Sequence, residues 1–187
     1  MSTSSNSLPD AVTLLLDRTH QSKVTEKLLR HLDVRVEIHK RHYLPGAPDP
    51  EWIADAAKRG WAIISGDKGI EYDGINRHAV AQSGARVFLL TDTESRGAEW
   101  AASLVMARHK IQRVATENRG PFFCNIEKGG DQHVKKPRFL EGGGPLPKPQ
   151  AMIESQMSVP DSGDGAATDD GSANPLKQQS VIDFPEK

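Results

Sequence analysis

The segment Trp61–Asp67 constrains the fold more than any other part of the chain. Its first four residues are mostly apolar, and they run into a Ser-Gly turn that ends in a carboxylate. A short apolar run that turn residues bound is typical of a strand buried on both faces, as in a parallel sheet. Open α/β sheets bind their ligands at the carboxyl ends of such strands. We therefore expect Asp67 to lie at a ligand-binding edge.

Predicted strands and helices alternate along the first 130 residues. Strands are expected at 12–16, 33–39, 61–64, 86–91 and 122–126. Helices are expected after Ser22, from Asp49 to Gly60, at 75–83 and from Ser95 to about Thr116, with a polar loop at 67–74. This order predicts an α/β fold, a three-layer α/β/α domain with a mainly parallel central sheet.

Two details of the predicted helices matter later. Val24, Leu28 and Leu32 recur every four residues beside Leu29, which predicts the apolar face of the first helix. Asp49 suits the N-cap of the second helix, because Pro50 then takes the first helical position. The alternating strand 33–39 is expected at an edge of the sheet.

Composition separates a folded body from a polar tail. From Glu141 onward the chain is rich in Gly, Pro, Ser and Asp and carries a net charge of −5, whereas residues 1–140 carry about +4. We predict a disordered leader at 1–10, one domain at 11–130 and a disordered tail at 131–187. A mildly basic body suits a polyanionic partner. Ordinary scatter of surface charge explains it equally well.

The sequence also bears on where the protein resides. Cys124 is the single cysteine, so no intrachain disulfide can form, and its apolar surroundings predict a buried thiol. No stretch approaches the roughly 20 apolar residues of a membrane span. The first seven residues lack the charged and apolar parts of a signal peptide. We therefore expect a cytoplasmic protein without a membrane partner.

Four acidic residues stand where strands end or helices begin: Asp17, Asp49, Glu51 and Asp67. In a parallel sheet these positions converge, and clustered carboxylates raise one another's pKa unless a cation is present. Mg²⁺ and Mn²⁺ prefer such oxygen ligands, and a bound ion supports phosphodiester hydrolysis by activating a water. Each acid alone also suits an ordinary role as a cap, a first-turn acid or a turn residue.

The order of these motifs resembles the PIN-like domains related to VapC-type ribonuclease toxins. The resemblance covers about residues 12–128 and includes an Asp after the first strand, the segment Pro48–Ile53, and a strand that ends in Ser65-Gly66-Asp67. It implies a metal-dependent endoribonuclease that cleaves single-stranded RNA and is neutralised by an antitoxin. It also implies Asp17, Asp49 or Glu51, and Asp67 as metal ligands and catalytic residues.

The chain departs from the family pattern in several places, among them the residues after Asp17, where Arg18-Thr19-His20 stands instead of a second acid or Asn. Gly69 stands where the family has a second late Asp, and Glu71 or Asp73 could replace it. Because this acid is missing, a second interpretation stands beside the nuclease: a catalytically inactive PIN-like module that binds RNA or a protein. A receiver-type phosphotransfer domain is a weaker alternative, because the first strand lacks an adjacent acid pair after it. A homodimer also stays open.

Basic and aromatic residues near the same edge could hold the RNA substrate. Cations contact phosphates and aromatic rings stack on bases. The predicted substrate-binding residues are Arg18, His20, Arg41, Tyr43 and Lys68. A solvated polar loop is the alternative interpretation of the segment 39–43.

Overall fold

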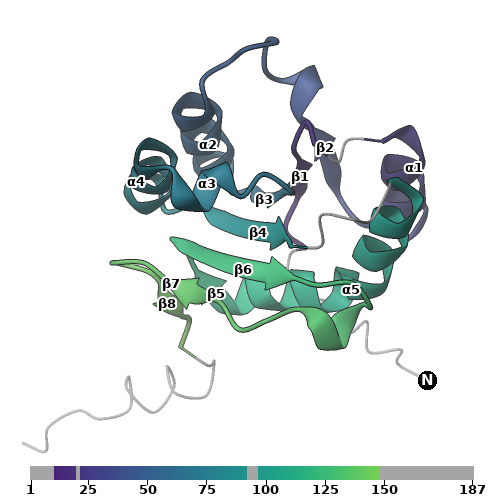
Figure 1. Cartoon of the computed structure of the whole chain (residues 1–187). Helices are drawn as coiled ribbons and strands as arrows, with labels where there is room; N and C mark the ends of the chain where they lie inside the picture. The colour runs from purple at the N-terminus through teal and green to yellow at the C-terminus, as the bar shows by residue number, and fades with distance from the viewer. Residues whose placement is uncertain (1–10, 20–21, 92–96, 148–187) are drawn as a thin grey trace, which may run out of the picture. The chain divides into compact units, whose positions relative to one another are not determined.

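A computed structural model describes residues 11–19, 22–91 and 97–147 (Figure 1). The strands are β1 (Leu14–Leu16), β2 (Val36–Ile38), β3 (Ala62–Ser65), β4 (Arg86–Leu90), β5 (Asn118–Arg119), β6 (Phe122–Ile126), β7 (Arg138–Phe139) and β8 (Gly144–Pro145). The α-helices are α1 (Lys23–His31), α2 (Asp49–Lys58), α3 (Gly69–Tyr72), α4 (Gly74–Ser83) and α5 (Gly97–Glu117). Two 3₁₀ turns, η1 (His39–Arg41) and η2 (Asp131–His133), complete the set.

The central sheet is mainly parallel, which confirms the predicted α/β class. Its strand order is β2-β1-β3-β4-β6-β7, and only the pairing of β6 with β7 is antiparallel. The chain leaves β1 toward β2 on one side and then crosses back to β3 on the other side. The strand order therefore reverses between β1 and β3, which is where open α/β sheets form their ligand crevice.

Helices cover both faces of the sheet, so its central strands are apolar throughout. Leu14 and Leu16 point to the core beneath α1 and α5, and Leu15 points to the core beneath α2 and α4. In the same way Ile63 and Ile64 face opposite cores, and both side chains are fully buried. This two-sided burial explains the continuous apolar run that precedes Asp67.

The helix ends agree only in part with the sequence-based expectations. Ser22 caps α1, since its side chain accepts a hydrogen bond from the Thr25 amide, and Gly84 ends α4 in the left-handed region. The prediction that Asp49 is an N-cap is wrong. Pro48 holds the N-cap position of α2 without a side-chain hydrogen bond. The carboxylate of Asp49, placed at the first residue of α2, therefore stays available for other contacts.

The first helix turns a different side to the core than the sequence predicted. Thr25 and Leu29 are its buried residues, whereas Val24, Leu28 and Leu32 are exposed. The strands beneath α1 are only three residues long, so they offer a narrow surface that Leu29 covers. The row of three aliphatic side chains is left outside the core.

Two further segments differ from the expectations. The predicted polar loop at 67–74 contains the short helix α3, and it begins where the Asp67 carboxylate accepts a hydrogen bond from the Gly69 amide. Residues 131–147 carry η2, β7 and β8, so described secondary structure continues past the predicted boundary at residue 130. The predicted cap Ser95, the leader at 1–10 and the tail beyond 147 lie outside the described residues.

Two smaller expectations concern burial and the membrane. Cys124 is buried as expected, and burial raises the pKa of its thiol to about 12. Among the helices of the described ranges, none combines the length and apolar character that a membrane crossing requires.

Candidate functional site

The candidate site lies at the carboxyl ends of β1 and β3, where the strand order reverses. Asp17 directly follows β1 and is 3% exposed, and Asp67 follows the end of β3 after one intervening residue, Gly66. The buried hydroxyl of Ser65 connects them. It donates to Oδ2 of Asp17 over 2.7 Å and accepts from the amide of Asp67 over 3.0 Å. Ser65 therefore fixes the backbone of Asp67 relative to the carboxylate of Asp17.

The carboxylate of Asp49 joins this arrangement from the start of α2. Its Oδ1 accepts hydrogen bonds from Nη2 of Arg18 and from the indole Nε1 of Trp52, each over 2.9 Å. Its Oδ2 accepts from the side-chain amide of Asn76 over 3.3 Å. Arg18 also donates its backbone N–H to Oδ1 of Asp17. Hydrogen bonds thus connect three of the four predicted acids in one network.

The fourth predicted acid, Glu51, stands apart from this network. Its side chain is exposed, and the structure gives no hydrogen bond between it and the three aspartates of the described chain. Glu51 follows Asp49 by two residues on α2, which places the two side chains about 200° apart around the helix axis. Only one of the two can point at the ends of β1 and β3.

Neither proposed substitute for the acid at position 69 joins the three aspartates. Glu71 accepts a hydrogen bond from Arg138 over 2.7 Å, and Arg138 also donates to Asn125. Asp73 caps α4 by accepting from the amides of Ile75 and Asn76. Both carboxylates are therefore occupied with contacts that hold the fold.

Aromatic residues support the site from the side of β2. The buried ring of His39 packs against Tyr43 at 4.8 Å and edge-on against Trp52 at 5.1 Å between ring centroids. Burial lowers the pKa of His39, and the charges of Asp17 and Asp49 partly oppose this shift. Within the described ranges, Nε2 of His39 has no hydrogen-bond partner. No local sequence pattern indicates Trp52, Ser65 or Asn76 as site residues, because their roles depend on contacts across the fold.

The predicted substrate-binding residues differ in how available they are. Lys68 is exposed. Arg41 forms a bidentate ion pair with Glu26, so its guanidinium already has a partner. The Tyr43 hydroxyl donates to Asp55 over 2.8 Å, and burial of this ring raises its pKa. Arg18 binds Asp49, as described above, and His20 lies outside the described residues. Tyr72 is a further aromatic residue that the sequence did not indicate for substrate binding. Its side chain is 78% exposed on α3.

The donor chemistry of the three aspartates suits a hard divalent ion, but their present arrangement does not hold one. Among the described residues, no three carboxylate, imidazole or thiol groups converge closely enough for a metal site. The Arg18 guanidinium lies 3.9 Å from Asp17 and 2.9 Å from Asp49, measured from nitrogen to carboxylate oxygen. This single cation offsets part of the charge of the two carboxylates. An ion bound to these two carboxylates would compete with Arg18 for their oxygens.

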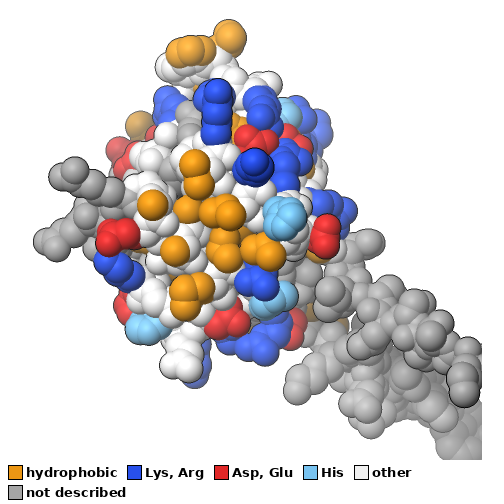
Figure 2. Space-filling model, turned by 90° about the vertical axis from the view of Figure 1, so that its right-hand side faces the viewer, with side chains coloured by type: hydrophobic (Ala, Val, Ile, Leu, Met, Phe, Trp, Pro, Cys, Tyr) orange, Lys and Arg blue, Asp and Glu red, His pale blue; other side chains and the backbone are white. Residues whose placement is uncertain are grey.

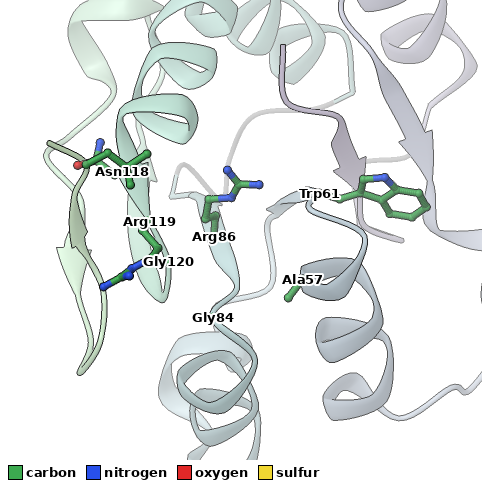
Figure 3. A pocket seen from close by; sticks show the side chains of 8 residues that line it. Ala57, Trp61, Gly84, Arg86, Asn118, Arg119 and Gly120 are labelled. Carbon is green, nitrogen blue, oxygen red and sulfur yellow. The ribbon is translucent and has the colours of Figure 1, made fainter. Parts of the chain in front are cut away.

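A cavity of about 220 Å³ lies where several of the strands begin, and Arg86 and Trp61 line it (Figure 3). Arg86 donates to the carbonyl of Ala115 over 2.8 Å and to that of Gly60. Burial lowers the pKa of this guanidinium. The donors of Arg86 thus satisfy backbone carbonyls at the ends of α5 and α2. The three aspartates of the candidate site do not line this cavity, so it is separate from the site.

Comparison with known proteins agrees with the arrangement at the sheet edge. Residues 12–92 match the family model described as PIN like domain. The chain therefore contains a PIN-like domain, as the resemblance implied. It is related to VapC-type proteins: it is 27% identical over 125 residues to "Putative ribonuclease VapC45" of Mycobacterium tuberculosis (strain ATCC 25618 / H37Rv). That alignment covers 65% of this chain and 90% of the relative. No solved structure matches the chain significantly.

Proposed function

We propose that this chain is a metal-dependent endoribonuclease of the PIN-like toxin type, which hydrolyses RNA phosphodiesters. The observation that supports the proposal most directly is the network joining Asp17, Asp49 and Asp67 at the reversal of strand order. The name of the relative, a ribonuclease, agrees with this reading.

Each residue of the network has a role in the proposal. Asp17, Asp49 and Asp67 would hold Mg²⁺ or Mn²⁺, and Glu51, on the other side of α2, would stay outside the metal site. When bound, the ion would supply charge neutralisation at the scissile phosphate and lower the pKa of water. Ser65 and Trp52 hold the Asp17 and Asp49 carboxylates in place. Arg18 would leave Asp49 and bind a phosphate oxygen of the RNA instead.

The substrate would lie across the exposed side of this edge. Lys68 and Arg41 are exposed cations that could contact phosphates, and the exposed ring of Tyr72 could stack on a base. Tyr43 would also contact the RNA, although its hydrogen bond to Asp55 restricts the movement of its ring. From the resemblance to VapC-type toxins we also propose an antitoxin partner, and from the sequence a cytoplasmic location.

A second candidate function is a catalytically inactive module that binds RNA or a protein. The ion pair between Arg18 and Asp49 favours it, because the guanidinium compensates the charge of Asp49 without a metal. Gly69 favours it as well, since it provides no side chain at the position of the family's second late Asp. This module would bind RNA in the presence of EDTA and cleave nothing.

The deciding experiment is incubation of the purified protein with a mixed RNA pool in Mg²⁺, Mn²⁺ or EDTA. Asp67→Asn is the test variant. Asp33→Asn is the matched control, since this exposed residue has φ +57°, which Asn adopts readily, and lies in the turn after α1. Metal-dependent cleavage that Asp67→Asn abolishes and Asp33→Asn retains supports the nuclease. Full activity in Asp67→Asn refutes the assigned site. Binding without cleavage under all three conditions supports the inactive module.

A further inference from the structure

Arg18 forms ion pairs with two of the three aspartates of the candidate site. Its guanidinium lies 2.9 Å from Asp49 and 3.9 Å from Asp17, measured from nitrogen to carboxylate oxygen. The Arg18 side chain is nevertheless 42% exposed. Ion pairs that water reaches contribute little to stability, so this guanidinium can exchange its partner at low cost.

The backbone around Arg18 is fixed, so only its side chain has to move in such an exchange. The Arg18 amide donates to Oδ1 of Asp17. The hydroxyl of Thr19 donates to Oδ2 of Asp17 over 3.3 Å and accepts from the amide of Gly66 over 3.1 Å. These contacts join this segment to the turn after β3. Rotation of the Arg18 side chain can therefore release Asp49 without displacing the carboxylate of Asp17.

The other two donors to Asp49 are held more firmly than Arg18. Trp52, whose indole donates to Oδ1, is 1% exposed. Asn76, whose amide donates to Oδ2, is half-buried on α4. If Arg18 leaves, these two contacts keep the carboxylate in place and one acceptor position opens on Oδ1. The departure of Arg18 thus prepares Asp49 to bind another cation.

We propose that Arg18 couples the binding of the divalent ion to the binding of RNA. In the free protein, its guanidinium occupies an oxygen of Asp49 and repels a second cation beside Asp17. A phosphate of bound RNA draws the guanidinium away, because arginine pairs strongly with phosphate oxygens, and so opens Asp49. Each ligand then raises the affinity for the other by the same factor. This inference rests on the proposed function and adds a site that acquires its ion together with its substrate.

Manganese binding to the RNA-free protein tests the competition directly. Electron paramagnetic resonance measures unbound Mn²⁺ beside the full chain and so gives the affinity without reference to activity. Arg18→Gln should bind Mn²⁺ about fivefold or more tightly than the parent chain, since couplings between sites are of this order. Arg18→Lys keeps the positive charge and should restore most of the competition. Circular dichroism checks that both variants fold.

Arg30→Gln is the matched control. Arg30 is 45% exposed and pairs with Glu26 over 3.0 Å on α1, so it resembles Arg18 in exposure and in having a carboxylate partner. Figure 2 shows the face of the molecule on which α1 lies, where Lys and Arg side chains adjoin Asp and Glu side chains. In the described part of the chain, none of the three aspartates pairs with Arg30. This variant should therefore bind Mn²⁺ as the parent chain does.

An oligonucleotide tests the coupling itself. The probe is a short fluorescein-labelled 2′-O-methyl RNA, and its methylphosphonate counterpart, whose linkages are uncharged, serves for comparison. Fluorescence anisotropy at fixed ionic strength gives the factor by which Mn²⁺ tightens probe binding. For the charged probe this factor should be about fivefold larger in the parent chain than in Arg18→Gln. The methylphosphonate probe should show no such difference, because it offers Arg18 no anionic oxygen.

The possible results separate this proposal from the proposed function. Equal Mn²⁺ affinities of the parent chain and Arg18→Gln, or equal tightening of the charged probe in both, overturn the coupling and leave the metal site standing. An equal gain in Arg30→Gln traces the effect to net charge and overturns the coupling as well. If neither the parent chain nor Arg18→Gln binds Mn²⁺, the proposed metal site fails, and the coupling fails with it.

Discussion

Ser65→Ala removes a single oxygen that makes two buried contacts at the proposed site. The hydroxyl donates to the buried carboxylate of Asp17 and accepts from the amide of Asp67. A hydrogen bond to a charged group contributes about 1.5–3 kcal/mol, and a neutral one contributes about 0.5–1.5 kcal/mol. Water can replace the second contact, because Asp67 is exposed, but not the first, because Asp17 is 3% exposed. We therefore expect a loss of about 2–3 kcal/mol in the free energy of unfolding.

Urea denaturation followed by tryptophan fluorescence measures this loss, with unfolding slopes compared to confirm that only stability changed. Ser65→Thr keeps the hydroxyl and should recover part of the loss, less the cost of a methyl group at a fully buried position. Ser83→Ala is the matched control, because its hydroxyl reaches only the Val80 carbonyl at 3.4 Å. If Ser65→Ala loses less than about 0.5 kcal/mol, the hydroxyl does not bridge Asp17 and Asp67 as described.

Three further predictions test other parts of the structure. Trp52→Phe keeps most of the buried ring but removes the indole donor to Asp49. RNA cleavage should therefore fall by a larger factor than in Trp61→Phe, because Trp61 lines the cavity at the other ends of the strands and has no hydrogen bond to the three aspartates within the described residues. The hydrogen bond from Arg41 lowers the pKa of Glu26 below its ordinary value. This pair therefore stabilises the fold above that ordinary pKa and loses its effect as the pH falls through the lowered pKa. The difference in Tm between the parent chain and Glu26→Gln should accordingly be present at pH 7 and vanish in strong acid; a constant difference would contradict the pairing. Gly143→Ala would place Cβ 2.3 Å from the Pro121 carbonyl oxygen and should lower Tm clearly, whereas Gly144→Ala meets no atom within 4 Å and should not; equal Tm values would show that the segment before β8 does not pack as described.

The sequence by itself determined the elements whose signals are local. The apolar runs of β3, β4 and β6 needed no knowledge of the fold, because strands buried on both faces must be apolar throughout. Ser22 and Gly84 were predictable for a similar reason, since a cap hydroxyl and a left-handed residue act within one turn of their own helix. The order of strands and helices then gave the α/β class and the edge at which Asp17 and Asp67 meet.

Only the tertiary structure decided which side of each helix faces the core, the candidate site or the solvent. Asp49 and Glu51 were equal candidates in the sequence, and the rotation of α2 against the sheet brought the first to Arg18 and Trp52. The row of Val24, Leu28 and Leu32 looked like a core face, but two short strands offered α1 too little surface to bury it. Glu71 was a candidate ligand until Arg138, 67 residues away, paired with it. Contacts between residues so distant in the chain depend on the packing of whole elements, which no local pattern encodes.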